Sequence, residues 1–399
     1  MKKILLLGGL RYLLPVIEAA HKQGYYVITA DYLPNNIAHK YSDEYINVSI
    51  TDKEAVLKEA KKRNIDGVIS FAVDPGVVTA SYVQEKMNLP AFGPYESVKI
   101  LQNKDLFRKF LTDNGFNVPK AKGYDSLESV LADGKNWNYP VIVKPTDSAG
   151  SKGVKRVDNE SELREAAENA FSNALKGKII IEDFIEPEGC TSDSDSFSVN
   201  GEMKVITFSA QRFDKDASNP YTPSAYSWPS TFTEEQQNEL SSELQRLIKL
   251  LKMDTTVYNI ETRVGKDGKA YIMEVSPRGG GNRLSEMIRY STGADLITSA
   301  VRAAVGDSVE VSSKPLNGHW AEVILHADES GKFFKLVMSD DFKSKYVYQI
   351  DLWVKEGDEI KSFNGANDAI GTLVLKTDNQ QDLENILNNQ RKYFQVEVE

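Results

Sequence analysis

The sequence predicts a multidomain protein of mixed α/β and α+β class, and three observations lead to that prediction. Residues 1–95 alternate apolar strands with amphipathic helices, a pattern typical of a parallel sheet covered by helices. The apolar segments 258–261 and 271–275 flank a Gly-rich turn and indicate an antiparallel hairpin. Residues 315–399 are again rich in short strand patterns. At roughly 100–200 residues per domain, 399 residues allow about two to four domains.

Composition excludes several classes of protein. The net charge of −10 argues against general affinity for nucleic acid or for an anionic membrane. No stretch approaches the roughly 20 apolar residues that span a bilayer, and the short apolar segment before Gly8 favours a buried strand over a signal peptide. The single cysteine, Cys190, excludes an intrachain disulfide and favours a cytoplasmic location. The four histidines are not spaced like a zinc site.

The N-terminal unit is expected to hold three strands and three helices in alternation. The strands are predicted at 3–7, 26–30 and 67–71, and the helices at 12–23, 51–64 and 74–87. Thr51 and Glu54 have the spacing of a capping box for the second helix. Gly8-Gly9 after a strand, with Asp31 about 20 residues on, suggests a dinucleotide site, but the turn lacks the third glycine of G-x-G-x-x-G. A tight turn after a buried strand is therefore favoured.

Basic residues follow at 96–153. Lys104 lies in the first turn of a helix predicted from about 102 to 114, where the helix N-terminus already favours an anion, although a solvated surface lysine fits the same pattern. Lys144 ends the apolar strand Val141–Lys144, and an amine there is poorly solvated unless it meets an anion. The small, flexible loop Ser148–Gly153 exposes backbone N–H groups to phosphate, and Lys152 adds charge; a plain hairpin turn is the alternative.

The segment Ile179–Ile185 is an apolar strand that turns acidic. Its edge would offer backbone groups to an adenine, with Phe184 and Ile185 as apolar walls and Glu182 accepting from the exocyclic amine. Taken alone, it is an ordinary strand.

Glu261 and Glu274 lie on two predicted strands joined by the turn Gly265–Lys269. Pairing across this hairpin would bring the carboxylates together, which is costly without a cation between them. Mg²⁺ prefers such oxygen ligands together with phosphate; two solvated surface glutamates are the alternative. Arg278 at the strand end can bind phosphate or an acyl phosphate in bidentate fashion. The run from Gly279 to Asn282 and Arg283 opens the next helix, and Arg283 would anchor a carboxylate.

Taken in order, these segments resemble the ATP-grasp superfamily, specifically its carboxylate–amine ligases. The segments are Lys104, VIVKP around Lys144, the SAGSKG loop, EDFI at Glu182–Ile185, NIE at Glu261 and MEVSPR at Glu274–Arg278. The resemblance extends to L-amino-acid ligases, carbamoyl-phosphate synthetases and phosphoribosylglycinamide synthetases, and it covers about residues 1–310.

The resemblance implies a domain plan and a set of ligands. The plan is an N-terminal parallel α/β pre-ATP-grasp domain (1–95), a helical linker (96–120), an ATP-grasp lid (121–190), a catalytic subdomain (191–310) and a β-rich, antiparallel C-terminal subdomain (311–399). ATP and Mg²⁺, or Mn²⁺ in its place, are the implied cofactors. Carried over by position, the phosphate contacts are Lys104, Lys144, Ser148, Ser151, Lys152 and Gly153. Glu261 and Glu274 hold the metal, and Arg278 steadies the acyl phosphate.

The sequence departs from this family at two places. Ser276 stands where many relatives have an asparagine that helps the metal. The ribose carboxylate is displaced into 186–195, where Glu188, Asp193 and Asp195 are all candidates.

Gln211–Ser230 is predicted to be a long loop that covers the acceptor pocket, since long loops in compact domains are usually functional or disordered and its aromatics and prolines argue against disorder. A loop that simply packs on the lid is the alternative. Its Tyr226 and Trp228, with Asn282 and Arg283, are the candidate substrate contacts. A helix capped by Thr233 and Gln236 is expected to follow the loop.

The function that the resemblance implies is an ADP-forming ligase that activates a carboxylate as an acyl phosphate and joins it to an amine. Its partners are small-molecule substrates, and homodimers are common among such enzymes. The alternatives are a small-metabolite kinase on the same scaffold, a non-catalytic nucleotide-binding protein and, more distantly, a dehydrogenase.

Overall fold

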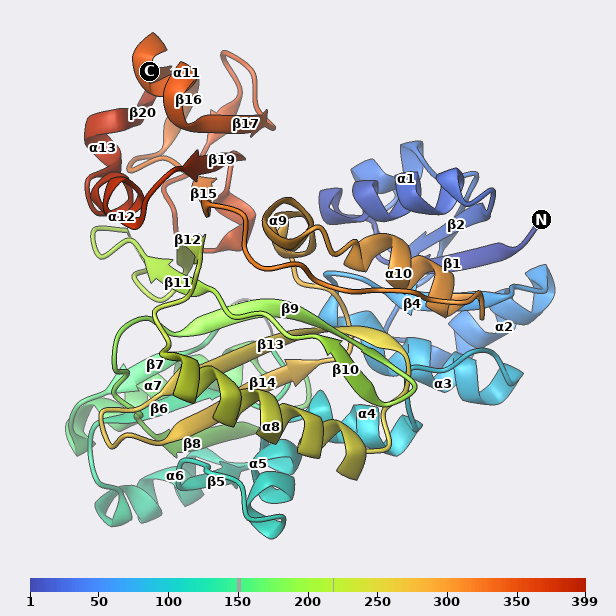
Figure 1. Ribbon diagram of the computed structural model, residues 1–399. Helices are drawn as coiled ribbons and strands as arrows, with labels where there is room; N and C mark the ends of the chain where they lie inside the picture. The colour runs from blue at the N-terminus through green and yellow to red at the C-terminus, as the bar shows by residue number, and fades with distance from the viewer. Residues whose placement is uncertain (149–151, 218) are drawn as a thin grey trace.

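The computed structural model describes residues 1–148, 152–217 and 219–399, whose strands form five sheets. The N-terminal unit carries a parallel sheet and the other four sheets are antiparallel, which confirms the predicted fold class. In Figure 1 the N-terminal sheet lies on the right, the β5–β8 sheet at the lower left and the C-terminal elements at the top. Among the described residues, no helix has the length and apolar character required to cross a membrane.

The N-terminal sheet has the strand order β3-β2-β1-β4. Its strands and covering helices are β1 (Lys3–Leu7), α1 (Leu14–Lys22), β2 (Tyr26–Asp31), β3 (Glu44–Asn47), α2 (Lys53–Arg63), β4 (Gly67–Ser70) and α3 (Val77–Met87). Leu5 and Leu7 enter one hydrophobic cluster and Ile4 and Leu6 another, so both faces of β1 are buried. A strand buried on both faces needs a continuous apolar run, which is why KILLL was recognisable.

Two local expectations were wrong here. The strand β3 was not predicted, because Glu44–Asn47 is short and half polar. The cap of α2 is Asp52, whose side chain accepts from the backbone N–H of Ala55 at 3.0 Å, and the expected capping residue Thr51 lies one position earlier. Aspartate competes well with threonine at this position, so the helix begins one residue later.

Two helices connect this unit to the next sheet: α4 (Tyr95–Leu101) and α5 (Lys104–Asp113). The side chain of Asn103 caps α5 by accepting from Leu106 N at 3.0 Å. The following sheet, of order β5-β8-β6-β7, is built on its own hydrophobic cluster. Its elements are β5 (Ala121–Tyr124), α6 (Leu127–Asp133), β6 (Val141–Pro145), β7 (Lys155–Val157), α7 (Leu163–Asn173) and β8 (Ile179–Asp183).

The central sheet, of order β10-β9-β13-β14, has one face on the helix α8. The elements are β9 (Ser192–Val199), β10 (Glu202–Val205), α8 (Glu234–Leu250), β13 (Thr256–Val264) and β14 (Ala270–Ser276). Thr233 and Gln236 form the predicted capping box at the start of α8. The apolar face of α8 packs with Ile260 and Val275 in one hydrophobic cluster. The side chains that alternate with these two along their strands project from the opposite face of the sheet.

The remaining chain forms a five-stranded sheet, β11-β12-β15-β19-β17, and a three-stranded sheet, β18-β16-β20. The elements are β11 (Ala210–Phe213), β12 (Pro223–Trp228), α9 (Leu284–Thr292), α10 (Leu296–Ala304), β15 (His319–Leu325), β16 (Gly331–Met338), α11 (Asp340–Tyr346), β17 (Val347–Leu352), β18 (Glu359–Ile360), β19 (Gly371–Thr377), α12 (Gln380–Asn388), α13 (Gln390–Tyr393) and β20 (Phe394–Val398). Short 3₁₀ helices lie at Arg11–Leu13, Ile37–Lys40, Asp74–Gly76, Gly134–Asn136, Glu160–Glu162 and Ala366–Asp368.

The strand β12 corrects the prediction that Gln211–Ser230 is one long loop. Gln211 pairs with Tyr226 across two antiparallel strands, and Trp228 pairs with Trp320 of β15. Two prolines of this segment, Pro223 and Pro229, lie at the first position of β12 and just after its end, where a strand tolerates them.

Candidate functional site

One face of the central sheet carries two rows of polar side chains. Asp193, Glu261 and Glu274 are in register across β9, β13 and β14, and Asp195, Asn259 and Ser276 form the adjacent row. Residues in register on adjacent strands project from the same face. The predicted pairing of Glu261 with Glu274 is therefore confirmed, and the turn between them closes with Gly265 N–H donating to Lys269 O at 2.9 Å. We refer to these six residues as the acidic face.

Burial and repulsion between the carboxylates change the pKa values of the acidic face. Burial, followed by the charge of Glu261, raises the pKa of Asp193 to about 7. The Asp193 carboxylate accepts from Asn259 Nδ2 at 2.7 Å and from the hydroxyl of Tyr226 at 3.3 Å. Glu261 and Glu274 keep about a third of their side chains exposed, at 35% each. An array of carboxylates that is open on one side suits a divalent cation, which would relieve the repulsion.

Asp195 has a different role from the ribose contact expected of it. It is fully buried, and its carboxylate accepts from Gly280 N–H at 2.8 Å and from the hydroxyl of Ser285. Burial raises the pKa of Asp195 to about 6. These bonds anchor the glycine run to β9. The N–H of Gly280 already donates to Asp195 and is therefore not free for a ligand. Of the three ribose candidates, Asp195 is buried, Asp193 is half-buried and belongs to the acidic face, and Glu188 is exposed.

Lys104 lies against the acidic face. It is the first residue of α5, and its Nζ lies 3.2 Å from Glu274 Oε2 and 3.3 Å from the carbonyl oxygen of Ser148. Burial lowers the pKa of Lys104, but the Glu274 carboxylate and its neighbours outweigh that effect and raise it above its ordinary value. The amine is therefore a fixed positive charge between the acidic face and the loop at Ser148.

Lys144 belongs to a buried ion-pair triad. Its Nζ donates to Glu182 Oε1 at 2.5 Å, and Arg108 Nε of α5 donates to the other oxygen of Glu182 at 2.9 Å. Arg108 and Glu182 are 3% and 2% exposed. Burial alone would raise the pKa of Glu182, but Arg108 and Lys144 hold it at about 2. Burial lowers the pKa of Lys144, and Glu182 offsets this only in part.

The triad changes the interpretation of Glu182. Both carboxylate oxygens are bound to cations, so its side chain is not free to accept from an adenine amine as expected. Arg108 was not a candidate, because nothing in the pattern of α5 separates it from a surface arginine. Phe184 and Ile185 are half-buried, and the guanidinium of Arg156 lies 4.5 Å from the centre of the Phe184 ring.

The loop after β6 is described at both ends only. Ser148 donates its hydroxyl to Asn173 O, Lys152 is exposed, and Gly153 has a φ of +72°. That φ lies in the left-handed region, where glycine is favoured. Ser151, the remaining predicted phosphate contact, lies outside the described residues.

Arg278 is held by a residue from the N-terminal unit. Asp74 accepts from Arg278 Nε at 2.8 Å and from Nη2 at 2.7 Å, and it also accepts from the hydroxyl of Ser276 at 3.0 Å. Burial raises the pKa of Asp74, but Arg278 outweighs it and keeps the pKa below its ordinary value. Since an arginine has more donors than these bonds use, Arg278 keeps capacity for an anion.

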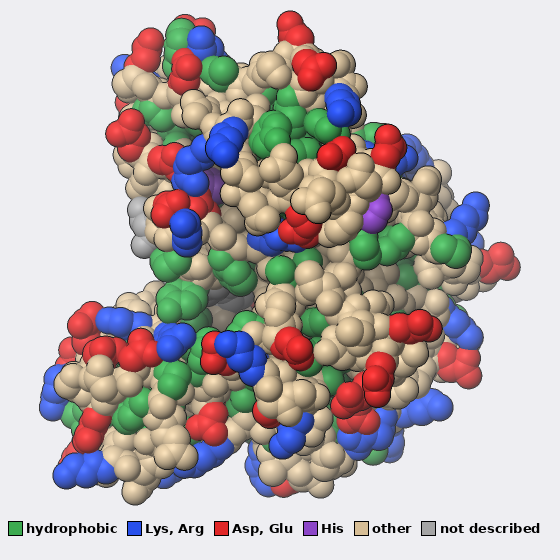
Figure 2. All heavy atoms as spheres, turned by 60° about the vertical axis from the view of Figure 1, so that its left-hand side comes forward, with side chains coloured by type: hydrophobic (Ala, Val, Ile, Leu, Met, Phe, Trp, Pro, Cys, Tyr) green, Lys and Arg blue, Asp and Glu red, His purple; other side chains and the backbone are tan. Residues whose placement is uncertain are grey.

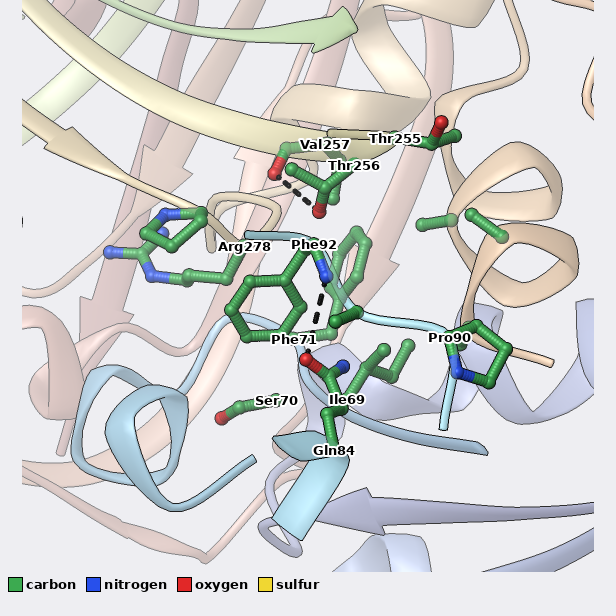
Figure 3. A pocket seen from close by; sticks show the side chains of 15 residues that line it. Ile69, Ser70, Phe71, Gln84, Pro90, Phe92, Thr255, Thr256, Val257 and Arg278 are labelled. Atoms are coloured by element: carbon green, nitrogen blue, oxygen red, sulfur yellow. Dashed lines mark hydrogen bonds between the residues drawn. The ribbon is translucent and has the colours of Figure 1, made fainter. Parts of the chain in front are cut away.

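Asp74 was missed as a site residue, although its position carried a signal. It follows β4, and ligands of open α/β sheets bind beyond the carboxyl ends of the strands. Figure 3 shows Arg278 near Phe71 and Phe92 in the small pocket between the N-terminal unit and the central sheet. The carbonyl oxygen of Gly279 also accepts from Ala72 N–H at 3.0 Å, so the loop after β14 is fixed to the end of β4.

Gly279 leaves no room for a side chain in this junction. A Cβ at Gly279 would lie 2.1 Å from the Phe71 ring, whereas one at Gly281 would meet nothing nearer than 3.8 Å. We expect Gly279→Ala to destabilise the fold by about 1–3 kcal/mol, as overpacking does, and Gly281→Ala to have little effect. Urea unfolding would measure both. A Gly279→Ala variant with the same urea midpoint as wild type would contradict the packing. The double variant Gly279→Ala, Phe71→Leu should recover part of the lost stability.

The predicted substrate contacts lie on two elements. Asn282 Oδ1 accepts from the hydroxyl of Tyr12 at 3.1 Å, and Arg283 is bound by Glu286, Tyr290 and Gln349. Tyr226 and Trp228, at 2% and 1% exposure, belong to β12 rather than to a covering loop. Tyr226 reaches the acidic face through Asp193, whereas Trp228 is packed in an apolar cluster. In the space-filling view a hollow with apolar side chains at its edge opens between the upper and lower lobes (Figure 2).

Part of this chain is similar to a known protein family. Residues 137–286 match the family model described as the ATP-grasp domain. The match covers fewer than half of the residues of this chain. The matched segment contains Lys144, the Ser148–Gly153 loop and the acidic face, while Lys104 and Asp74 lie before it.

The relatives of this chain are distant. The carbamoyl phosphate synthase large chain of Clostridium perfringens (strain SM101 / Type A) is 24% identical over 298 residues, which are 74% of this chain but only 27% of that protein. The L-amino acid ligase from Bacillus licheniformis superposes with a TM-score of 0.83 at 20% identity, covering 100% of this chain and 99% of the other. Phosphoribosylglycinamide synthetase from Anaerococcus prevotii gives 0.76 at 21%, with both chains fully covered at 100%. At such identities the structural likeness establishes the fold.

Proposed function

We propose that this protein uses ATP to join a carboxylate to an amine and releases ADP and phosphate. The observation that carries the proposal is the acidic face with Lys104 bound at its edge, because it combines a cation site with a fixed positive charge. The ligases and synthetases among the structural neighbours support the same class of reaction.

The side chains present fit ATP and a divalent metal. Glu261 and Glu274 offer carboxylate oxygens, the ligands that Mg²⁺ prefers, and they remain partly open to solvent. When bound, Mg²⁺ supplies charge neutralisation to the phosphate oxygens. Lys104 and Lys144 would bind the phosphates, Lys152 would add charge from the loop, and Phe184 and Ile185 would bound the adenine. Glu188 is the remaining proposed ribose contact.

The reaction would proceed in two steps. A carboxylate oxygen attacks the γ-phosphorus of ATP, the bond to the β,γ-bridging oxygen breaks, and ADP leaves with that electron pair. The lone pair of a neutral amine then attacks the acyl carbon of the resulting acyl phosphate, the carbon–oxygen bond to phosphate breaks, and the nitrogen loses a proton. Arg278, fixed by Asp74, would stabilise the charge on the acyl phosphate, as preorganised donors do.

The first test is to incubate the protein with MgATP and pooled amino acids and small carboxylates, and to measure ADP and free phosphate separately. The proposal expects both to rise together, and only when a carboxylate and an amine are both present. ADP without phosphate would instead indicate a kinase. Binding of ATP without release of either product from the whole pool would contradict the ligase assignment and favour a nucleotide-binding protein.

A further inference from the structure

Glu322 is a buried acid that the proposed chemistry does not use. It lies in the middle of β15 with no exposed surface, and neither carboxylate oxygen has a hydrogen-bond partner among the described residues. Buried carboxylates are ordinarily paired with a cation or with donors, as Glu182 is. A buried carboxyl group without a partner lowers the stability of the fold unless a bound ligand supplies the missing hydrogen bonds.

The side chain of Glu322 points into an apolar cluster. Its strand neighbours on the same face, Trp320 and Ile324, belong to the cluster that also holds Leu284 and Met287 of α9, whereas Ala321 and Val323 belong to the cluster of the opposite face. The register places Tyr226 of β12 directly beside Glu322, with Val374 of β19 on its other side. Glu322 is thus an acidic side chain among buried apolar and aromatic side chains.

A second unpaired group lies near Glu322. Arg283 is the residue just before α9. Its Nη1 is buried without a hydrogen-bond partner in the part of the chain that the structure describes, although Nε and Nη2 donate to Glu286 and Nη2 also to other partners. The charges of Arg283, Glu286, Asp193 and Asp195 all act on Glu322, and that of Glu322 acts on the hydroxyls of Tyr12 and Tyr226. An unpaired carboxyl group and an unpaired guanidinium N–H therefore share one neighbourhood.

This neighbourhood adjoins the acidic face. The hydroxyl of Tyr226 donates to Asp193, and Asp193 is in register with Glu261. The hydroxyl of Tyr12 donates to Asn282, next to Arg283. A compound held at Glu322 would therefore lie behind the carboxylates expected to hold the metal, separated from them by one tyrosine.

We propose that Glu322 forms a subsite for a primary ammonium group of the substrate, with the rings of Tyr226 and Trp320 beside it and Arg283 Nη1 available to an anionic group of the same molecule. Ammonium fits better than a metal ion, because a single carboxylate among apolar side chains and next to a guanidinium offers a metal too few ligands. Aromatic faces attract organic cations. The inference rests on the proposed ligase function, to which it adds a specificity-determining residue.

The test compares ligands that differ in one group. The thermal midpoint of the full chain with MgADP is measured with the standard L-amino acids and a set of primary amines, each beside the analogue that has hydrogen in place of the ammonium group. We expect at least one ammonium compound to raise the midpoint while its analogue does not. A wild-type protein that responds to no ammonium compound, or equally to both members of every pair, overturns the inference.

Two variants make the assignment specific. Glu322→Gln should weaken binding of the responding compound by about tenfold or more and leave the affinity for MgADP unchanged. Thr372→Val is the matched control, because Thr372 on the neighbouring β19 is also buried and its hydroxyl has no hydrogen-bond partner among the described residues. This variant should bind as wild type does. If Glu322→Gln does not fold, Glu322→Asp replaces it and should keep the preference for ammonium. Wild-type affinity in Glu322→Gln refutes the subsite.

The outcomes separate this inference from the proposed function. Release of ADP and phosphate that needs no ammonium compound would leave an ATP-dependent enzyme and remove the Glu322 subsite. Failure to bind MgADP would remove the proposed function, whereas the response to ammonium compounds without nucleotide would still decide the subsite.

Discussion

Replacing Glu261 by glutamine should lower the rate of ADP release by about a thousandfold. The neutral amide is a poor ligand for Mg²⁺, and the cross-strand pair would lose half of its charge. The fold should tolerate the change, because the Glu261 side chain is 35% exposed and its nearest cation, Arg263 Nη2, lies 3.9 Å away. Removing its charge also takes away one of the effects that raise the pKa of Asp193, so that pKa should fall below about 7.

Two measurements and a control variant would check this result. Steady-state ADP release gives the rate, and Mn²⁺ titration followed by electron paramagnetic resonance gives metal binding in the presence of ATP independently of turnover. Glu186→Gln is the matched control, since Glu186 is an exposed glutamate paired with Lys266 on the surface, and it should behave as wild type does. A Glu261→Gln enzyme within about tenfold of the wild-type rate would refute the metal assignment.

Replacing Glu182 by alanine should have the largest effect on stability. The carboxylate joins two cations that are nearly inaccessible, since Lys144 is 12% and Arg108 is 3% exposed. Removing one member of a buried ion-pair network leaves the others unpaired and typically costs about 3–5 kcal/mol. Urea unfolding should show this loss, and ADP release should fall with it because Lys144 would lose the partner that fixes its position.

The pH dependence gives a second readout of the triad. Because the pKa of Glu182 is lowered to about 2 in the folded protein, its contribution to stability is complete above its ordinary value near 4.5 and is lost as the pH falls through about 2. Glu182→Ala should therefore flatten the acid limb of the stability curve. Glu165→Gln removes an exposed pair with Lys155 in the same unit and should leave the midpoint unchanged. An acid limb that is the same in Glu182→Ala and wild type would contradict the pairing.

Local signals account for what the sequence could predict. The register of Glu261 with Glu274 follows from a short turn between two strands, so a segment of about 14 residues is enough to predict it. The cap of α8 and the apolar run of β1 are equally local. The cap of α2 was placed one residue early because Thr51 and Asp52 both suit that position.

The missed features depend on contacts between distant segments. Asp74 meets Arg278 across 204 positions, and Arg108 meets Met273 O across 165. No periodicity within either segment distinguishes these residues from surface charges. The strand β12 was taken for a loop because its prolines and aromatics are locally ambiguous, and its pairing with β15 is what decides the structure.

The ion pair between Asp74 and Arg278 limits which segments of this protein can be exchanged with those of a relative. The ATP-grasp match begins at residue 137, yet the guanidinium inside the match is oriented by a carboxylate that precedes it by more than sixty positions. A chimera that joins the matched segment to the front of a distant homologue would inherit an arginine without its counter-ion. Recombination between relatives should therefore preserve activity only when the loop after β4 and the loop after β14 come from the same parent.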